Sequence, residues 1–230
     1  MNKETRYLEF DIRAERTEEK GSVITGQPIV FNQETDLGGG IRETIDAGAL
    51  DATDLRDVRF LVGHDFSMVP LARSRNNNAN STMQLMVNET GMGIRVNLDT
   101  DNNPRAAELY SAIQRGDISG RSFAFTVDKD SWDGLDTDSP LRHIRSIERV
   151  FEVSAVAFPA YEGTSIQAAS EGDALESVKA SLESARKQQE EERAAAAAAE
   201  EARQAEEAAQ ERRRAVLERL ENLKKEVRVK

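Results

Sequence analysis

Three polar side chains of types that cooperate in catalysis lie in otherwise apolar stretches of the chain. His64 ends one stretch, Ser122 begins a second, and Glu152 stands within a third. Buried polar groups cost free energy unless they are paired, so these side chains are expected to satisfy one another. A histidine takes the proton of a serine hydroxyl, and a carboxylate orients the imidazole and stabilises its protonated form. The three residue types therefore indicate the chemistry of a serine hydrolase.

The spacing of these residues is weak support when it is taken alone. A histidine near a strand end is more often structural, and Glu152 on an edge strand would simply face solvent. The order histidine, serine, glutamate differs from the subtilisin and chymotrypsin orders, although geometry rather than order defines a triad. The chain has no G-x-S-x-G motif, which argues against an α/β-hydrolase. A hydrolase and a protein without catalysis both stay open on this basis.

The composition argues against several other chemistries. The 230 residues include no cysteine, which excludes disulfides, thiolate metal sites and cysteine nucleophiles. His64 and His143 are the two histidines, too few for a histidine-rich metal site. The formal net charge is −11 and lies mostly in residues 1–169. Such an acidic body repels phosphate backbones, so we expect no direct nucleic-acid ligand. We also expect no bound metal and no cofactor.

The sequence gives no sign of a membrane or secretion signal. The first twenty residues lack the apolar core of a signal peptide, and no stretch approaches the roughly 18 apolar residues of a membrane span. We therefore expect a soluble, cytosolic protein that does not bind membranes.

Residues 1–169 are expected to form mostly β-strands. In Tyr7–Ala14, apolar and polar residues alternate with the period of two that marks a strand with one buried face. Further strands are expected at residues 21–30, 58–63, 83–87, 93–98, 122–127, 144–150 and 151–158. The sequence predicts an α+β, strand-dominated domain.

A helix and two loops interrupt these strands. Asn103–Arg115 has apolar residues at helical spacing, with a proline in its first turn and a glycine after its end. Asp36–Gly40 and Asp128–Pro140 are expected to be loops. The alternation after Ser122 places its side chain opposite the face of Phe123, where a nucleophile would meet solvent.

The last part of the chain, residues 170–230, has a different pattern. Apolar residues recur at coiled-coil spacing near 175–185 and again near 216–227, and neither proline nor glycine follows Gly172. We expect a long charged helix from about residue 175 to residue 227 that pairs loosely with other helices. A partly disordered low-complexity tail is the alternative, because an alanine-rich helix needs packing to be fully stable.

Five stretches, in this order and spacing, resemble the prohead proteases of tailed phages over roughly residues 8–165. They are Gly26–Asn32, Ile41–Leu50, Val62–Asp65, Gly116–Phe125 and Glu152–Tyr161. That family is related to the herpesvirus assemblins. The resemblance implies a β-barrel surrounded by helices, with a serine protease domain at residues 1–169 and a coiled-coil-prone helical tail at 170–230.

The resemblance also assigns roles to individual residues. His64 corresponds to the family histidine and Ser122 to the nucleophile, although Ala124 stands where glycine is usual. Glu152 is our choice for the third member, and His143 is its rival because assemblins use a second histidine. Ser119 is the rival of Ser122.

The oxyanion hole stays unassigned, with Arg121, Arg145 and backbone amides as candidates.

As a member of this family, the protein is expected to cleave the major capsid protein and scaffold segments, and itself. It would act inside the prohead in the host cytoplasm and self-associate through the protease domain and the helix. An internal scaffolding protein with an inactive protease-like body is the alternative, and a hydrolase unrelated to capsids is a third reading.

Overall fold

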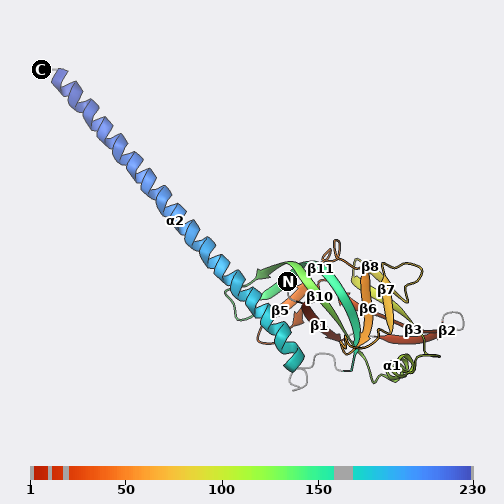
Figure 1. Ribbon diagram of the computed structural model, residues 1–230. Coiled ribbons are helices and arrows are strands. Elements are labelled where there is room, and N and C mark those ends of the chain that lie inside the picture. Colours follow the sequence, from red (N-terminus) through yellow and green to blue (C-terminus); the bar gives the residue numbers. More distant parts are fainter. Residues whose placement is uncertain (1–2, 10–11, 18–20, 158–167, 229–230) are drawn as a thin grey trace. The chain divides into compact units, whose positions relative to one another are not determined.

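The computed structural model describes residues 3–9, 12–17, 21–157 and 168–228. The strands in these ranges are β1 (Lys3–Glu9), β2 (Arg13–Thr17), β3 (Gly21–Val30), β4 (Thr35–Asp36), β5 (Arg42–Ile45), β6 (Asp57–Val62), β7 (Ala72–Arg75), β8 (Met83–Asn88), β9 (Gly91–Leu98), β10 (Gly120–Asp133) and β11 (Leu141–Val156), and the helices are α1 (Pro104–Arg115) and α2 (Ala168–Arg228) (Figure 1). This composition confirms a strand-dominated α+β protein. The chain divides into two compact units, Met1–Leu182 and Glu183–Lys230.

The first unit contains two sheets. In the larger sheet the strand order is β1-β10-β11-β5-β4, and β6 pairs with the second half of β11 and with β7. β10 and β11 are antiparallel, whereas β5 and β6 run parallel to β11. The smaller sheet has the antiparallel order β2-β3-β9-β8. The strands that the structure describes do not close into a barrel, so the expected assemblin-like barrel is not observed.

One hydrophobic core joins the two sheets. Phe123 and Phe125 of β10 stack with their ring centroids 4.8 Å apart, and both are fully buried. The same cluster contains Ile24 of β3, Ile94 of β9 and Phe60 of β6. The face of β10 that carries the two phenylalanines is therefore the core face, as the alternation predicts.

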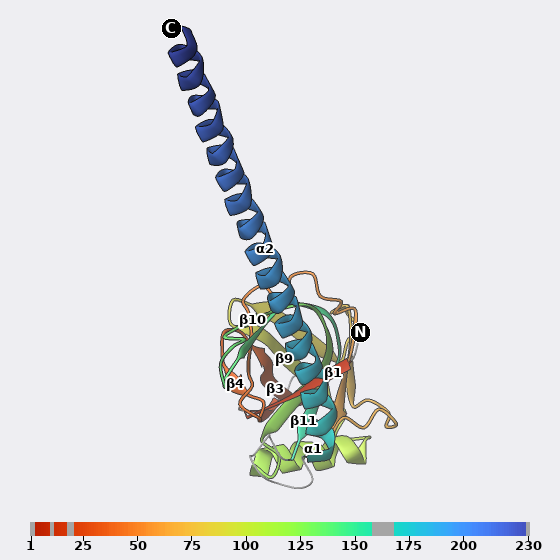
Figure 2. The ribbon, with the colours of Figure 1, turned by 90° about the vertical axis from the view of Figure 1, so that its left-hand side faces the viewer.

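Helix α1 begins and ends where the sequence predicts. The side chain of Asn103 accepts hydrogen bonds from the backbone N–H groups of the first turn, and Pro104 occupies the first helical position. Gly116 ends the helix in the left-handed conformation, with φ of 82°. The helix contacts β2 and β9. Figure 2 shows it at one end of the sheets.

Three strand predictions need correction. Tyr7–Ala14 is not one strand, because β1 and β2 belong to different sheets. The expected loop Asp128–Pro140 begins only after Asp133, and the two strands predicted within 144–158 are one continuous β11, with residue 158 outside the described residues. Register shifts in β10 between residues 124 and 130 explain the misplaced loop. Such bulges keep a strand paired while they destroy the alternation of its side chains.

Helix α2 is continuous from Ala168 to Arg228, and its early turns belong to the first unit. Val178 and Leu182 are buried in a cluster with Ile41, and Trp132 packs against this cluster. The indole Nε1 of Trp132 donates to the hydroxyl of Ser181 at 3.3 Å. These contacts fix the start of the helix on the sheet domain.

In the second unit the described side chains of α2 are largely exposed. Arg203 pairs with Glu200 at 2.8 Å and with Glu207 at 3.9 Å along the helix surface. Coiled-coil pairing of this helix stays a prediction. Neither helix in the described part of the chain is long and apolar enough to span a membrane.

Candidate active site

The structure brings Ser122, His64 and Glu152 together in one hydrogen-bonded chain. The hydroxyl oxygen of Ser122 lies 2.6 Å from Nε2 of His64. On the other side of the ring, Nδ1 lies 2.6 Å from Oε1 of Glu152. A base in contact with a hydroxyl, itself oriented by a carboxylate, is the arrangement that activates a serine.

Three neighbouring strands position these side chains. Ser122 of β10 is paired with Ser154 of β11, and Glu152 lies two residues before Ser154 on the same face. β6 runs along the other edge of β11 and pairs Leu61 with Ser154. The chain leaves β6 at Val62, which brings His64 over this face. Residues that are far apart in the sequence therefore meet through strand register.

A sharp turn after β6 aims the imidazole. Gly63 and His64 both adopt left-handed backbone conformations, with φ of 60° and 58°. That conformation is uncommon for a residue with a Cβ, so it requires support from the surroundings. The backbone N–H of Gly63 donates to the carbonyl of Ala155 at 3.0 Å. The N–H of His64 donates to the hydroxyl of Ser154 at 3.1 Å.

Ser122 does not meet solvent, which corrects the expectation from the alternation. Its exposed fraction is 0%, as is that of Glu152, whereas the His64 side chain is 14% exposed. The reason is contact with distant segments, because the His64 ring lies against the Ser122 hydroxyl and β1 pairs along the outer edge of β10. The Ser122 hydroxyl donates to the backbone carbonyl of Arg6 in this strand at 2.6 Å. Since a hydroxyl has a single proton, this carbonyl and Nε2 of His64 compete for it.

A comparison with known families agrees with this geometry. The model of the caudovirus prohead serine proteases matches residues 8–179. The chain belongs to this family. The match includes the strands that carry all three side chains.

Two individual relatives extend the comparison. The prohead protease of Enterobacteria phage HK97 is 28% identical over 160 residues, which are 70% of this chain and 65% of that protein. The chain thus spans about two-thirds of that relative's length. The capsid assembly protease of bacteriophage T4 matches with 11% identity and a TM-score of 0.33, over 66% of this chain and 98% of that one. A likeness of this size does not establish a common fold.

The residues that rival Glu152 and Ser122 as site candidates in this family member lie elsewhere. Nδ1 of His143 lies 3.0 Å from Asp46, and its Nε2 lies 3.2 Å from Asp133. This histidine is therefore engaged by two aspartates outside the chain of Ser122 and its partners. Ser119 is exposed and precedes β10.

The two arginines considered for the oxyanion hole also have definite surroundings. Arg145 donates to Ser131 at 2.9 Å and pairs with Asp46. Arg121 is 1% exposed and precedes Ser122 in the strand, so it points to the opposite face. There it lies against Gly26, where a Cβ atom would be 2.4 Å from its Nη1. Neither side chain is placed to face the Ser122 hydroxyl.

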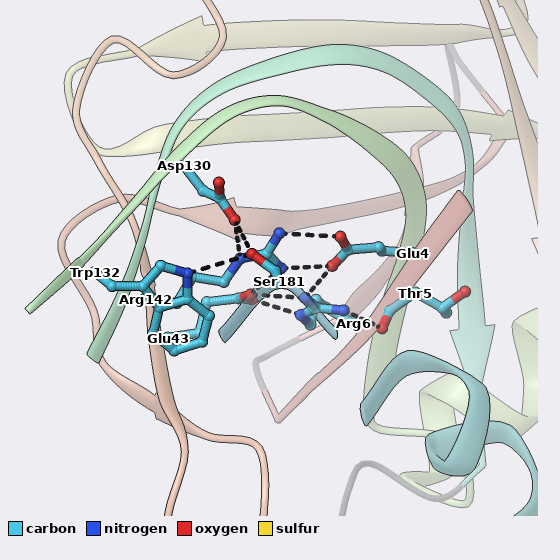
Figure 3. A network of polar contacts seen from close by, with 8 residues as sticks. All are labelled: Glu4, Thr5, Arg6, Glu43, Asp130, Trp132, Arg142 and Ser181. Carbon is cyan, nitrogen blue, oxygen red and sulfur yellow. Dashed lines mark hydrogen bonds and ion pairs between the residues drawn. The ribbon is translucent and has the colours of Figure 1, made fainter. Parts of the chain in front are cut away.

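A buried ionic network anchors β1 beside the site (Figure 3). Arg6 contacts Glu43 of β5 through two hydrogen bonds of 2.5 and 2.6 Å, and it also pairs with Glu4. Arg142 of β11 contacts Glu4 at 2.8 Å and Asp130 at 2.7 Å. The network thus joins β1, β5, β10 and β11, and it holds the Arg6 carbonyl against Ser122.

The charges in this network offset the cost of burial. Burial acts to raise the pKa of Glu4, but the charges of Arg6 and Arg142 outweigh it and hold that pKa below its ordinary value. Burial acts to lower the pKa of Arg142, and its contacts with Glu4 and Glu43 raise it instead. Glu4 and Arg142 therefore keep their charges at neutral pH.

Sequence reasoning missed two residues at this site, Ser154 and Arg6. Ser154 donates to Oε2 of Glu152 at 2.5 Å, in addition to its contact with His64. Its position two residues after Glu152 was a usable signal, because alternate residues of a strand share a face. Arg6 acts through its backbone carbonyl, which has no signature in the sequence.

Proposed function

We propose that this prohead protease family member is a serine endopeptidase that cleaves capsid and scaffold proteins, and itself, during prohead maturation. The observation that supports this most directly is the continuous contact from Ser122 through His64 to Glu152, at 2.6 Å on both sides of the imidazole. Family membership over residues 8–179 gives it a substrate class. The HK97 relative is itself a prohead protease.

In the proposed mechanism, Ser122 attacks the scissile carbonyl while His64 takes the hydroxyl proton at Nε2. The resulting imidazolium is stabilised by the Glu152 carboxylate, and His64 then delivers the proton to the leaving amine. A water molecule, activated by His64 in the same way, hydrolyses the acyl-enzyme and restores the serine. The pair His64–Glu152 is largely shielded from solvent, which strengthens its electrostatic interaction.

The hydrogen bond to β1 bears on when this reaction occurs. While the Ser122 hydroxyl donates to the Arg6 carbonyl, its proton is directed away from Nε2. Attack on a peptide therefore requires this proton to turn from the Arg6 carbonyl to Nε2 of His64. The buried ionic network holds the carbonyl in place and so favours the first orientation.

The same proposal gives a role to each of the two parts of the chain. Residues 1–169 form the protease domain, and residues 170–230 tether it to helical scaffold or capsid segments or to a second copy of the chain. The site of action is the interior of the prohead in the host cytoplasm. The surface of α2 is largely exposed and carries acidic and basic residues in nearly equal numbers, which supports a role in association.

The deciding experiment replaces the nucleophile. When the Ser122→Ala variant is co-expressed with the major capsid protein, we expect no processing of that protein, although the variant keeps its fold. Mass spectrometry of the products measures the processing. Ser119→Ala is the matched control and should process normally. Normal processing by Ser122→Ala would overturn the assignment. Failure of a fluorophosphonate to label Ser122 in assembled proheads would indicate an inactive protease-like body instead.

A further inference from the structure

Ser154 is a buried serine that contacts both His64 and Glu152, the residues that would activate the candidate nucleophile Ser122. Its exposed fraction is 0%. Its hydroxyl lies 2.5 Å from Oε2 of Glu152 and 3.1 Å from the backbone nitrogen of His64. A backbone N–H only donates, so the hydroxyl accepts from His64 and its single proton goes to the carboxylate. Both directions are therefore determined.

The bond to Glu152 fixes which way the carboxylate faces. Oε2 is held by Ser154, and this leaves Oε1 for Nδ1 of His64 at 2.6 Å. Without the first bond, rotation of the carboxylate about its terminal torsion would be less restricted. A fully buried carboxylate also needs hydrogen-bond donors for its oxygens, and the hydroxyl supplies one.

The bond to His64 holds the turn that aims the ring. His64 has φ of 58°, a conformation that a residue with a Cβ seldom adopts without support. Ser154 accepts from its N–H at the point where the chain turns after β6. The hydroxyl stands on β11, between β10 with Ser122 and β6 with the histidine loop. One side chain thus couples the positions of base and carboxylate.

We propose that Ser154 is a positioning residue, which holds Glu152 aligned on Nδ1 and fixes His64 for proton transfer from Ser122. It contacts neither the substrate nor the reacting hydroxyl in this role. The inference rests on the proposed function, because it names a further residue of the same site.

The test compares three variants of the full chain. Ser154→Ala removes the hydroxyl, and Ser154→Thr keeps it on a residue that strands accommodate well. Ser74→Ala is the matched control, because Ser74 is also fully buried in a strand but bonds to Asn77, away from the site.

The first readout is kcat and KM, measured separately for cleavage of a capsid-protein substrate. In Ser154→Ala, the Glu152 carboxylate loses the donor at Oε2 and the N–H of His64 loses its acceptor, so proton transfer is impaired while substrate binding is not. We expect kcat to fall roughly 10- to 100-fold with little change in KM, since a buried partner is left unsatisfied. Ser154→Thr should restore kcat. Ser74→Ala should lower thermal stability without lowering kcat.

A second readout needs no substrate. A proton shared by Nδ1 of His64 and Glu152 gives a low-field NMR signal, which we expect in wild type, Ser154→Thr and Ser74→Ala and expect lost or shifted in Ser154→Ala. An unchanged signal in folded Ser154→Ala, or a loss that lies in KM rather than kcat and is not rescued by threonine, overturns the proposal. Failure of the proposed function shows separately, as processing that persists in Ser122→Ala.

Discussion

The carboxylate of Glu152 lies 2.6 Å from Nδ1 of His64 and is completely shielded from solvent. Across the strand pair, Ala124 of β10 stands opposite Glu152 and is also fully buried. The methyl group of Ala124 is therefore accommodated beside the carboxylate. The contact at Nδ1 makes Glu152, and not His143, the hydrogen-bond partner of His64.

Replacement of that carboxylate should disable proton transfer without unfolding the protein. In Glu152→Gln, the amide oxygen is expected to face Ser154, which donates, so the NH₂ group faces Nδ1. The imidazole then carries its proton on Nε2 and cannot accept from Ser122. We expect kcat to fall by about 10³- to 10⁴-fold, measured by processing of capsid substrate. His143→Gln is the control and should keep nearly wild-type activity, whereas equal losses in both variants would contradict the assignment.

Loss of one arginine from the buried network should strongly destabilise the first unit. Arg142→Met removes the arginine that pairs with Asp130 and one of the two that pair with Glu4, so the buried network loses a cation, at a cost of about 3–5 kcal/mol in the free energy of unfolding. Denaturant titration followed by fluorescence of Trp132, the single tryptophan, reports this unit, whereas far-UV circular dichroism also reports the long helix. Arg56→Met, which removes an exposed ion pair with Asp54, should leave the transition unchanged. A wild-type midpoint for Arg142→Met would refute a stabilising network.

The same network predicts a loss of stability in acid. The pKa of Glu4 is lower in the folded protein than its ordinary value, which is about 4.3 in unfolded chains. Its contribution to stability is therefore present above that value and is lost as the pH falls through the folded pKa. Melting temperatures between pH 3 and 7 should decline below about pH 5, and Glu4→Gln should show a lower but flatter curve. The exposed-loop variant Glu89→Gln should follow wild type, and an equally steep decline in Glu4→Gln would show that Glu4 is not responsible.

Close packing of Gly26 against Arg121 predicts a sharp difference between two glycines of the smaller sheet. A Cβ at Gly26 would lie 2.4 Å from Nη1 of Arg121, which is 1% exposed and has little room to move. Gly26→Ala should cost about 1–3 kcal/mol in unfolding free energy by overpacking. A Cβ at Gly93 would meet its nearest atom, of Met86, at an ordinary 3.5 Å. Gly93→Ala should therefore be neutral or slightly stabilising, and equal melting temperatures for the two variants would disprove the steric argument.

The sequence by itself determined the features that depend on neighbouring residues. The bounds of α1 follow from Asn103, Pro104 and Gly116, and each of them acts within one turn of the helix end. The continuity of α2 follows from the absence of helix-breaking residues after Gly172. The core face of β10 follows from the alternation at Phe123 and Phe125, which local geometry imposes on any strand. The types of the three candidate residues could be read from the sequence, but the distances between their side chains could not be predicted from it.

Only the tertiary structure decided how these elements meet. Strand register brings Glu152 rather than His143 to His64, and it places Ser154 between them. The bulges in β10 depend on its pairing with β11, and β1 pairs with the other edge of β10 across more than a hundred residues, so no local pattern predicts either feature. Distant segments also enclose the Ser122 hydroxyl, which lies against Nε2 of His64 and the backbone carbonyl of Arg6. Local residue patterns specify which side of a strand faces the core, whereas long-range register specifies which residues become neighbours.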